Sequence, residues 1–262
     1  MIKHKIVLTC VAVFLIVGLT SFNNDTKFAD DFLEFWTDVK NNYAYFDKKN
    51  TDWQKVKTNY LPQAQNAKTR NELIAILENA IEELYDNHFS LNTNLQSSTR
   101  LVPSGIDIWA EYINDKAIIT EVRQNSPAHK AFIKPGAEII AINGVPVNQA
   151  VNNRIGKCII KINDEVKNYA LKQLLAGTYL VKRVLTLKQN NNTTTITLND
   201  VKDTTQALLD FETLNNNIGY IKFNNSLGET RVVQQFDSAL NNLKNTKALI
   251  IDLRSTPSGG TL

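Results

Sequence analysis

The stretch ALIIDLRSTPSGG, residues 248–260, decides the fold class of the last part of the chain. It begins as a continuous apolar run, typical of a strand buried on both faces of a parallel sheet, and it ends as a polar loop with two glycines. An apolar run at 218–223 and an amphipathic pattern at 232–243 precede it. Together they predict one β-α-β unit, and the loop after its second strand lies where ligands gather in open α/β sheets.

Residues 104–199, upstream of this unit, have the pattern of a compact β-rich module. Ile106 and Ile108 alternate with polar residues, and the apolar run 139–142 is followed by Asn143-Gly144, the dipeptide most typical of a two-residue hairpin. Similar signals predict a helical turn opened by Ser126-Pro127-Ala128, a helix over 165–175, and a hairpin of 184–188 with 193–198.

Residues 28–84 predict helices, because their aromatic and aliphatic residues recur at three- and four-residue steps. Thr69 followed by Glu72 is a capping box, which opens a helix that ends just before His88. Thr51 with Gln54 is a second candidate for a capping box. Pro62 predicts a break after the short helix that Thr51 would open.

The N-terminus predicts export. Lys3 and Lys5 precede an apolar run at 6–19, and small residues follow it, which is the pattern of a secretory signal over residues 1–21. The run is short for a transmembrane helix, which needs about 20 apolar residues. An uncleaved anchor is the alternative, and in either case we expect the periplasm or the cell envelope.

The composition is globular, with 43% hydrophobic and 21% charged residues among 262. A formal net charge of +3 without a basic cluster argues against nucleic acid as a partner. The two cysteines are Cys10, inside the signal, and Cys158, so a mature chain can build neither a disulfide nor a cysteine-based zinc site. No ligand cluster is present, and we expect neither a metal nor an organic cofactor.

Three features, in this order, resemble the C-terminal-processing (tail-specific) serine peptidases in their tricorn-core-like branch. The first is the helical segment that closes with LYDNHFSL, residues 84–91. The second is the module at 104–199, which looks like a bacterial PDZ domain through Gly105-Ile106-Asp107-Ile108, Ser126-Pro127-Ala128 and residues 136–144. The third is residues 218–221 with IIDLR, residues 250–254, and Gly259-Gly260.

The resemblance implies an α+β multidomain chain. Its parts would be a signal peptide over 1–21, an N-terminal helical domain over 22–99, a PDZ-like β-rich domain over 100–200, and the start of an α/β peptidase core over 201–262. The last part is expected to be incomplete, because one β-α-β unit leaves the faces of a parallel sheet uncovered.

The tricorn-like branch implies a serine nucleophile, a histidine base, and a carboxylate that orients the histidine. A serine hydroxyl is a weak nucleophile until a base takes its proton. His88 matches the family's histidine, since it follows an acidic residue by two positions at a helix end. The alternative is a histidine that only caps the carbonyls of that helix. His129 has no partner motif and is expected at the surface.

Gly259 and Gly260 match the family's glycines near the oxyanion hole, where backbone N–H groups stabilise the developing alkoxide. A tight turn after a buried strand is the alternative. Thr256 stands where the family usually has Asn, and Ser258 adds a residue to the loop. Asp252 and Arg254 are expected to form a structural charge pair at the strand exit.

The PDZ-like module implies peptide binding by strand addition. The resemblance assigns this role to Gly105, Ile106, Asp107 and Ile108, whose backbone amides would meet a terminal carboxylate. The partner would be a peptide or an unfolded protein, and a membrane only through an uncleaved signal. The alternative is a docking domain that only packs against the core.

The family's serine and its carboxylate lie downstream of the glycine loop, and no G-x-S-x-G occurs in the chain. We therefore expect the front part of an exported serine endopeptidase, without its nucleophile and inactive alone. The alternative is a catalytically dead, PDZ-like peptide-binding protein of the envelope. A purely structural envelope domain is a third class.

Overall fold

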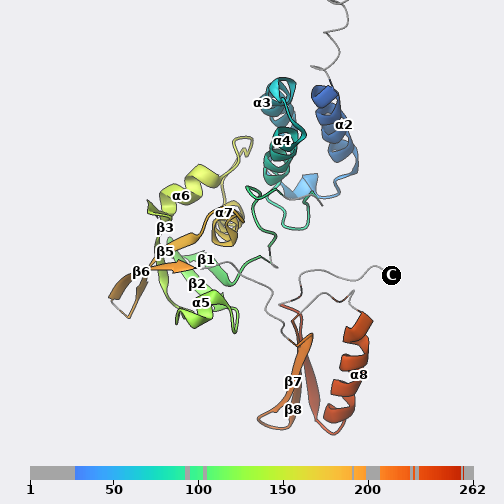
Figure 1. The fold of residues 1–262 in the computed structure, drawn as a ribbon, viewed down its shortest axis with the longest axis vertical. Coiled ribbons are helices and arrows are strands. Elements are labelled where there is room, and N and C mark those ends of the chain that lie inside the picture. Colours follow the sequence, from blue (N-terminus) through green and yellow to red (C-terminus); the bar gives the residue numbers. More distant parts are fainter. Residues whose placement is uncertain are drawn as a thin grey trace, which may run out of the picture. The chain divides into compact units, whose positions relative to one another are not determined.

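The structure is a computed structural model (Figure 1) that describes residues 27–91, 95–102, 105–190, 192–198, 207–224, 227, 230–254 and 256. The predicted signal segment and the Gly259-Gly260 pair lie outside these residues. Among the described helices, none has the length and apolar character needed to cross a membrane. The chain forms two compact units, Met1–Leu95 with Gly156–Ile162, and Gln96–Ile155 with Asn163–Leu262. The helices and sheets confirm the predicted α+β class.

The first unit consists of helices α2 (Lys27–Asn42), η1 (Phe46–Lys48), α3 (Trp53–Asn66) and α4 (Arg70–Glu82). Its core contains the fully buried side chains of Phe32, Val56 and Leu84. Two tryptophans tie α2 to α3. The indole N–H of Trp36 donates to the carbonyl of Trp53 at 2.8 Å, and the indole N–H of Trp53 donates to the carbonyl of Trp36 at 3.0 Å.

Thr69 is confirmed as the N-cap of α4, because its hydroxyl accepts the N–H of Glu72 at 3.2 Å. The Glu72 carboxylate accepts the N–H of Lys68 at 2.6 Å, one residue before the position that a capping box requires. The prediction at Thr51 is wrong. Asp52 caps α3 instead, since its carboxylate accepts the N–H of Lys55 at 3.0 Å, whereas Thr51 bridges to Ile159. Pro62 does not end α3 either, and tertiary packing outweighs the local cost because the following turn buries Ala64 completely.

The second unit contains the predicted β-rich module, which is a six-stranded sheet of order β1-β2-β3-β5-β6 with β4 beside β3. The Asn143-Gly144 hairpin between β3 and β4 is confirmed, with φ of 50° and 80° at its two central residues, as a type I′ turn requires. The strands are β1 (Ile108–Ile113), β2 (Lys116–Val122), β3 (Glu138–Ile142), β4 (Val145–Pro146), β5 (Arg183–Gln189) and β6 (Asn192–Leu198), and the helices are α5 (Pro127–Lys130), α6 (Val147–Arg154) and α7 (Asp164–Ala176).

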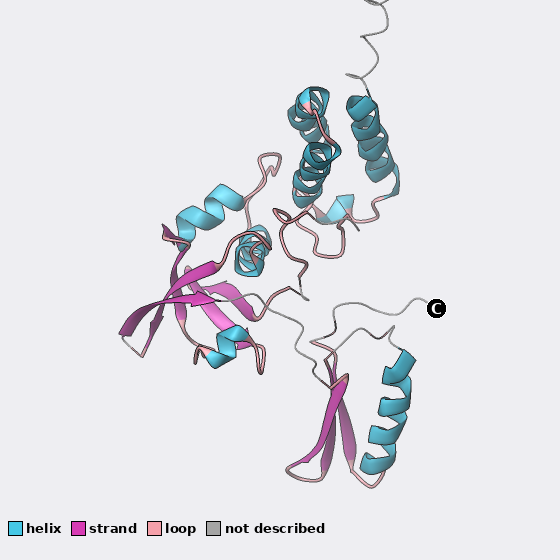
Figure 2. Cartoon of the chain, viewed as in Figure 1, coloured by secondary structure: helices cyan, strands magenta, loops and turns pink. Residues whose placement is uncertain are grey.

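The predicted β-α-β unit is also present, as β8 (Ile218–Phe223), α8 (Thr230–Leu243) and β9 (Ala248–Asp252), with β8 and β9 parallel. A strand without a predicted counterpart, β7 (Leu209–Leu214), pairs antiparallel with β8. Figure 2 shows α8 alongside this three-stranded sheet. The apolar side chains of β9 are 39–47% exposed at Leu249, Ile250 and Ile251, because β9 is an edge strand and α8 packs on β7 and β8.

Candidate functional site

His88 lies in a turn that begins just after α4 ends at Glu82. Tyr85 has a φ of 38°, a left-handed conformation that is uncommon for a bulky residue and costs about 1–3 kcal/mol. Surrounding contacts hold it there. The hydroxyl of Tyr85 accepts the backbone N–H of Asn50 at 2.6 Å, and its carbonyl accepts the Lys49 ammonium at 3.4 Å. The turn is therefore a strained element fixed by its neighbours.

Asp86 joins this turn to the end of α2. Its Oδ1 accepts the backbone N–H of His88 at 2.9 Å, and its Oδ2 accepts the hydroxyl of Tyr43 at 2.7 Å. Burial, together with the hydrogen bond to Asp86, raises the pKa of Tyr43, so the phenol keeps its proton and remains a donor. His88 itself is exposed, and its imidazole forms no hydrogen bond with any described residue. It does not cap α4 in this structure.

Glu83 precedes the turn and is only 1% exposed. Its carboxylate accepts the hydroxyl of Tyr60 at 2.8 Å, the N–H of Lys157 at 3.0 Å and the N–H of Cys158 at 2.9 Å. These bonds hold the segment Gly156–Ile162 against α3 and the end of α4, all within the first unit. The sequence does not reveal this role, because two of the bonded groups are backbone amides far along the chain.

We expect Glu83→Ala to expose the buried thiol of Cys158. Burial and the neighbouring Glu83 carboxylate raise the pKa of this thiol to about 12, so at pH 8 it is protonated and hardly reactive. Without the carboxylate, the segment loses two hydrogen bonds, those from the N–H groups of Lys157 and Cys158, and opens more often. In a Cys10→Ser background, alkylation by iodoacetamide at pH 8 should accelerate at least about tenfold, which corresponds to about 1.4 kcal/mol of opening free energy. Glu34→Ala, at an exposed position on α2, is the control, and an equal rate in both variants would contradict the assignment.

The predicted peptide-binding residues of the PDZ-like module are mostly buried. Ile106 and Ile108 belong to its core, and Asp107 is fully buried in an ion pair with Arg183. Asp107 also accepts the N–H of Ala128 at 3.1 Å. Gly105 is partly exposed, and its N–H donates to the carbonyl of Leu101 at 2.6 Å. The four residues lead into the first strand of the module, which begins at Ile108, and their peptide-binding role stays a prediction.

The strand next to them, β1, lies at the edge of its sheet and packs beside α7. Asn168 on α7 bonds to it, since its Oδ1 accepts the backbone N–H of Tyr112 at 2.8 Å. Lys172 and Glu111 form a second contact between the helix and the strand, with 3.6 Å between Nζ and Oε1. A peptide that extends the sheet along β1 must replace the bond from Asn168.

The strand exit at β9 carries the predicted charge pair, which is confirmed. Nε and Nη2 of Arg254 donate to the two carboxylate oxygens of Asp252 at 3.0 and 2.7 Å, and the hydroxyl of Tyr220 donates to the same carboxylate. These hydrogen bonds, led by those from Arg254, hold the pKa of Asp252 well below its usual range against the opposing effect of burial. The glycines that would follow this loop lie outside the described residues, so the oxyanion assignment stays a prediction.

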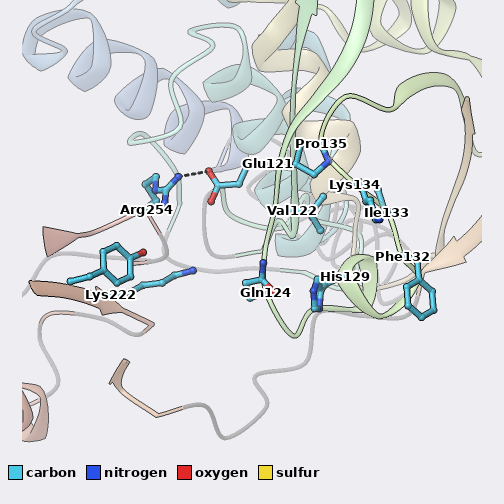
Figure 3. Close-up of a pocket in the computed structure, with 11 residues that line it drawn as sticks. Glu121, Val122, Gln124, His129, Phe132, Ile133, Lys134, Pro135, Lys222 and Arg254 are labelled. Carbon is cyan, nitrogen blue, oxygen red and sulfur yellow. Dashed lines mark hydrogen bonds and ion pairs between the residues drawn. The ribbon is translucent and has the colours of Figure 1, made fainter. Parts of the chain in front are cut away.

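Arg254 also reaches the PDZ-like module within the second unit. Its Nη1 lies 3.2 Å from Oε2 of Glu121 (Figure 3), beside a cavity of about 490 Å³. His129, Lys134 and Lys222 line the same cavity, together with apolar side chains such as those of Val122 and Phe132. His129 is exposed, as predicted for a surface residue. Among the described residues, no group of three or more His, Cys, Asp or Glu is arranged to hold a metal ion.

Known proteins match this arrangement of modules. A model of the Tricorn protease C1 domain matches residues 24–82, and a model of the PDZ domain matches residues 88–167. The carboxy-terminal processing protease CtpA of Bacillus subtilis (strain 168) is 25% identical over 223 residues, which cover 82% of this chain and 43% of that protein. The chain thus spans less than half the length of this curated relative.

A solved structure has a similar fold, and a second one matches less well. The structure of mature CPAF complexed with lactacystin covers 91% of this chain and 57% of its own, with a TM-score of 0.52 and 12% identity. The photosystem II D1 C-terminal processing protease covers 89% of this chain and 62% of its own, with a TM-score of 0.45 and 18% identity. The CPAF likeness concerns the fold alone. In its Tricorn C1 and PDZ domains, in this order, and in its similarity to CtpA, the chain resembles the C-terminal-processing proteases.

Proposed function

We propose that this chain is the amino-terminal part of an exported serine-type endopeptidase in which His88 is the general base. The observation that carries the proposal is the placement of His88. Its imidazole is exposed and is not bonded to any described residue, while its backbone is fixed by Asp86 on a strained turn. An accessible base on a rigid support is what abstraction of a proton from a nucleophile requires.

In the proposed reaction, a serine supplied by polypeptide outside these 262 residues attacks the scissile carbonyl carbon. His88 takes the hydroxyl proton and then gives it to the leaving amine as the C–N bond breaks. Backbone N–H groups at Gly259 and Gly260 would stabilise the oxyanion. Water then hydrolyses the acyl-enzyme with His88 again as base. The chain alone should therefore be inactive.

The proposed substrate is a peptide or unfolded protein that the PDZ-like module holds as an added strand along β1. The position of β1 at the sheet edge and the backbone of Gly105–Ile108 beside it support this part of the proposal. The predicted signal at residues 1–21 supports action in the periplasm or cell envelope.

The test is an intact-mass measurement on the protein isolated from its source after exposure to a serine-reactive fluorophosphonate. We expect a species well above 29.5 kDa that gains the mass of one probe in the native but not the denatured sample. A species near or just below 29.5 kDa that stays unlabelled would contradict the proposal. It would favour a peptide-binding envelope protein without catalysis.

A further inference from the structure

Residues 43–50, which form most of the connection between α2 and α3, lie against the turn that carries His88. Both belong to the first compact unit. Asn50 bonds to the hydroxyl of Tyr85, Lys49 bonds to its carbonyl, and the Lys49 ammonium lies 4.3 Å from the centre of the Tyr85 ring. The conformation of the turn therefore depends on residues 35 and 36 positions earlier in the chain.

Tyr43 is the residue of this connection that acts closest to His88. Its hydroxyl donates to Asp86 on one side of His88, at 2.7 Å. Its ring stacks on that of Phe89 on the other side, with centroids 5.6 Å apart and planes inclined by 28°. Tyr43 thus contacts both residues that flank positions 87 and 88. It contacts Asp86 through a hydrogen bond and Phe89 through ring packing.

Asp86 transmits the polar contact to the backbone of His88. One carboxylate oxygen accepts from Tyr43, and the other accepts from the N–H of His88 at 2.9 Å. Hydrogen bonds to an ionised acceptor are stronger than neutral ones. With its backbone fixed in this way, His88 keeps only the rotations about its own side-chain bonds.

We infer that Tyr43 and Asp86 are positioning residues for His88, which hold its backbone in one place so that the imidazole meets its target in one geometry. This inference rests on the proposed function of His88 as the base. Neither residue is assigned a contact with the substrate. Catalytic groups must be held within about 0.5 Å and 10–20° of their working geometry, so loosening the turn should reduce turnover rather than substrate binding.

The first measurement is amide hydrogen exchange on the 262-residue chain, which needs no hydrolysis. We expect Tyr43→Phe to accelerate exchange at the His88 amide about tenfold, since it removes one hydrogen bond to a charged group. Asp86→Ala should accelerate it further, because it removes the acceptor itself. Tyr45→Phe is the matched control, because it deletes a phenol hydroxyl from a side chain that is 58% exposed in the same connection.

The second measurement is a steady-state comparison in the complete peptidase. Tyr43→Phe should lower kcat about tenfold with KM unchanged and with the midpoint of thermal unfolding close to that of the parent. Unchanged His88 exchange in Tyr43→Phe, or equal acceleration in Tyr45→Phe, would overturn the inference. If His88 exchange responds as expected but His88→Ala retains full hydrolysis, the turn is held as inferred and the proposed function fails.

Discussion

Replacing His88 with alanine in the complete peptidase is expected to lower kcat for peptide hydrolysis by about 10³-fold or more. A positioned general base contributes about 10²–10⁴-fold, and in a serine mechanism the loss of the base removes most of the nucleophile's activation. KM should change little, because the peptide-binding role is proposed for the PDZ-like module. The measurement is a kcat and KM determination with a fluorogenic peptide.

The matched control is His129→Ala. His129 is also an exposed histidine, and its Nδ1 accepts the N–H of Asn125 at 3.3 Å, within the PDZ-like module. This variant should keep kcat within about twofold of the parent, as expected for a surface substitution. Loss of activity in His129→Ala comparable to that in His88→Ala would show that the assay is responding to something other than the base.

Replacing Asp107 with alanine is expected to destabilise the PDZ-like module by about 3–5 kcal/mol. Asp107 is fully buried and Arg183 is 2% exposed, so the substitution leaves a guanidinium in the core without its carboxylate. It also removes the acceptor for the N–H of Ala128. The measurement is native-state hydrogen exchange of amides in β2 and β5, which reports this module separately from the helical unit.

Glu111→Ala is the control for this experiment. It also breaks an ion pair to a basic residue, but Glu111 is half exposed and Lys172 is one-quarter exposed, so we expect a cost below about 1 kcal/mol. If Asp107→Ala costs no more than Glu111→Ala, the buried pair does not stabilise the module. If Asp107→Ala costs about 3–5 kcal/mol, the side chain of Asp107 stabilises the module. Of this predicted peptide-binding residue, only the backbone is then available to bind a peptide.

Elements set by residues near one another in the chain could be predicted. The N-cap at Thr69 and the Asn143-Gly144 hairpin depend on residues within a few positions of each other. The β-α-β unit follows from three consecutive apolar patterns. The strand β7 could also have been found, since LDFETL, residues 209–214, alternates apolar and polar residues at its start. Thr51 was a wrong cap because the adjacent Asp52 competes for the same role.

The candidate site could be predicted only in part. The sequence singled out His88, and it identified Asp252 and Arg254 as a pair because they are two residues apart. It did not reveal what fixes the turn of His88. Tyr43 and Asp86 are 43 positions apart, and neither belongs to a sequence motif that would predict their contact.

By itself, the sequence determined the order of the modules and the class of each, and it predicted His88 as the histidine of a peptidase mechanism. Only the tertiary structure decided which polar groups are buried together. Glu83 meets amides 74 and 75 residues away, and Asp107 meets a guanidinium 76 residues away. The physical reason is that secondary structure follows from local sterics and the period of apolar residues, whereas a buried charge is tolerated only where distant segments bring it partners.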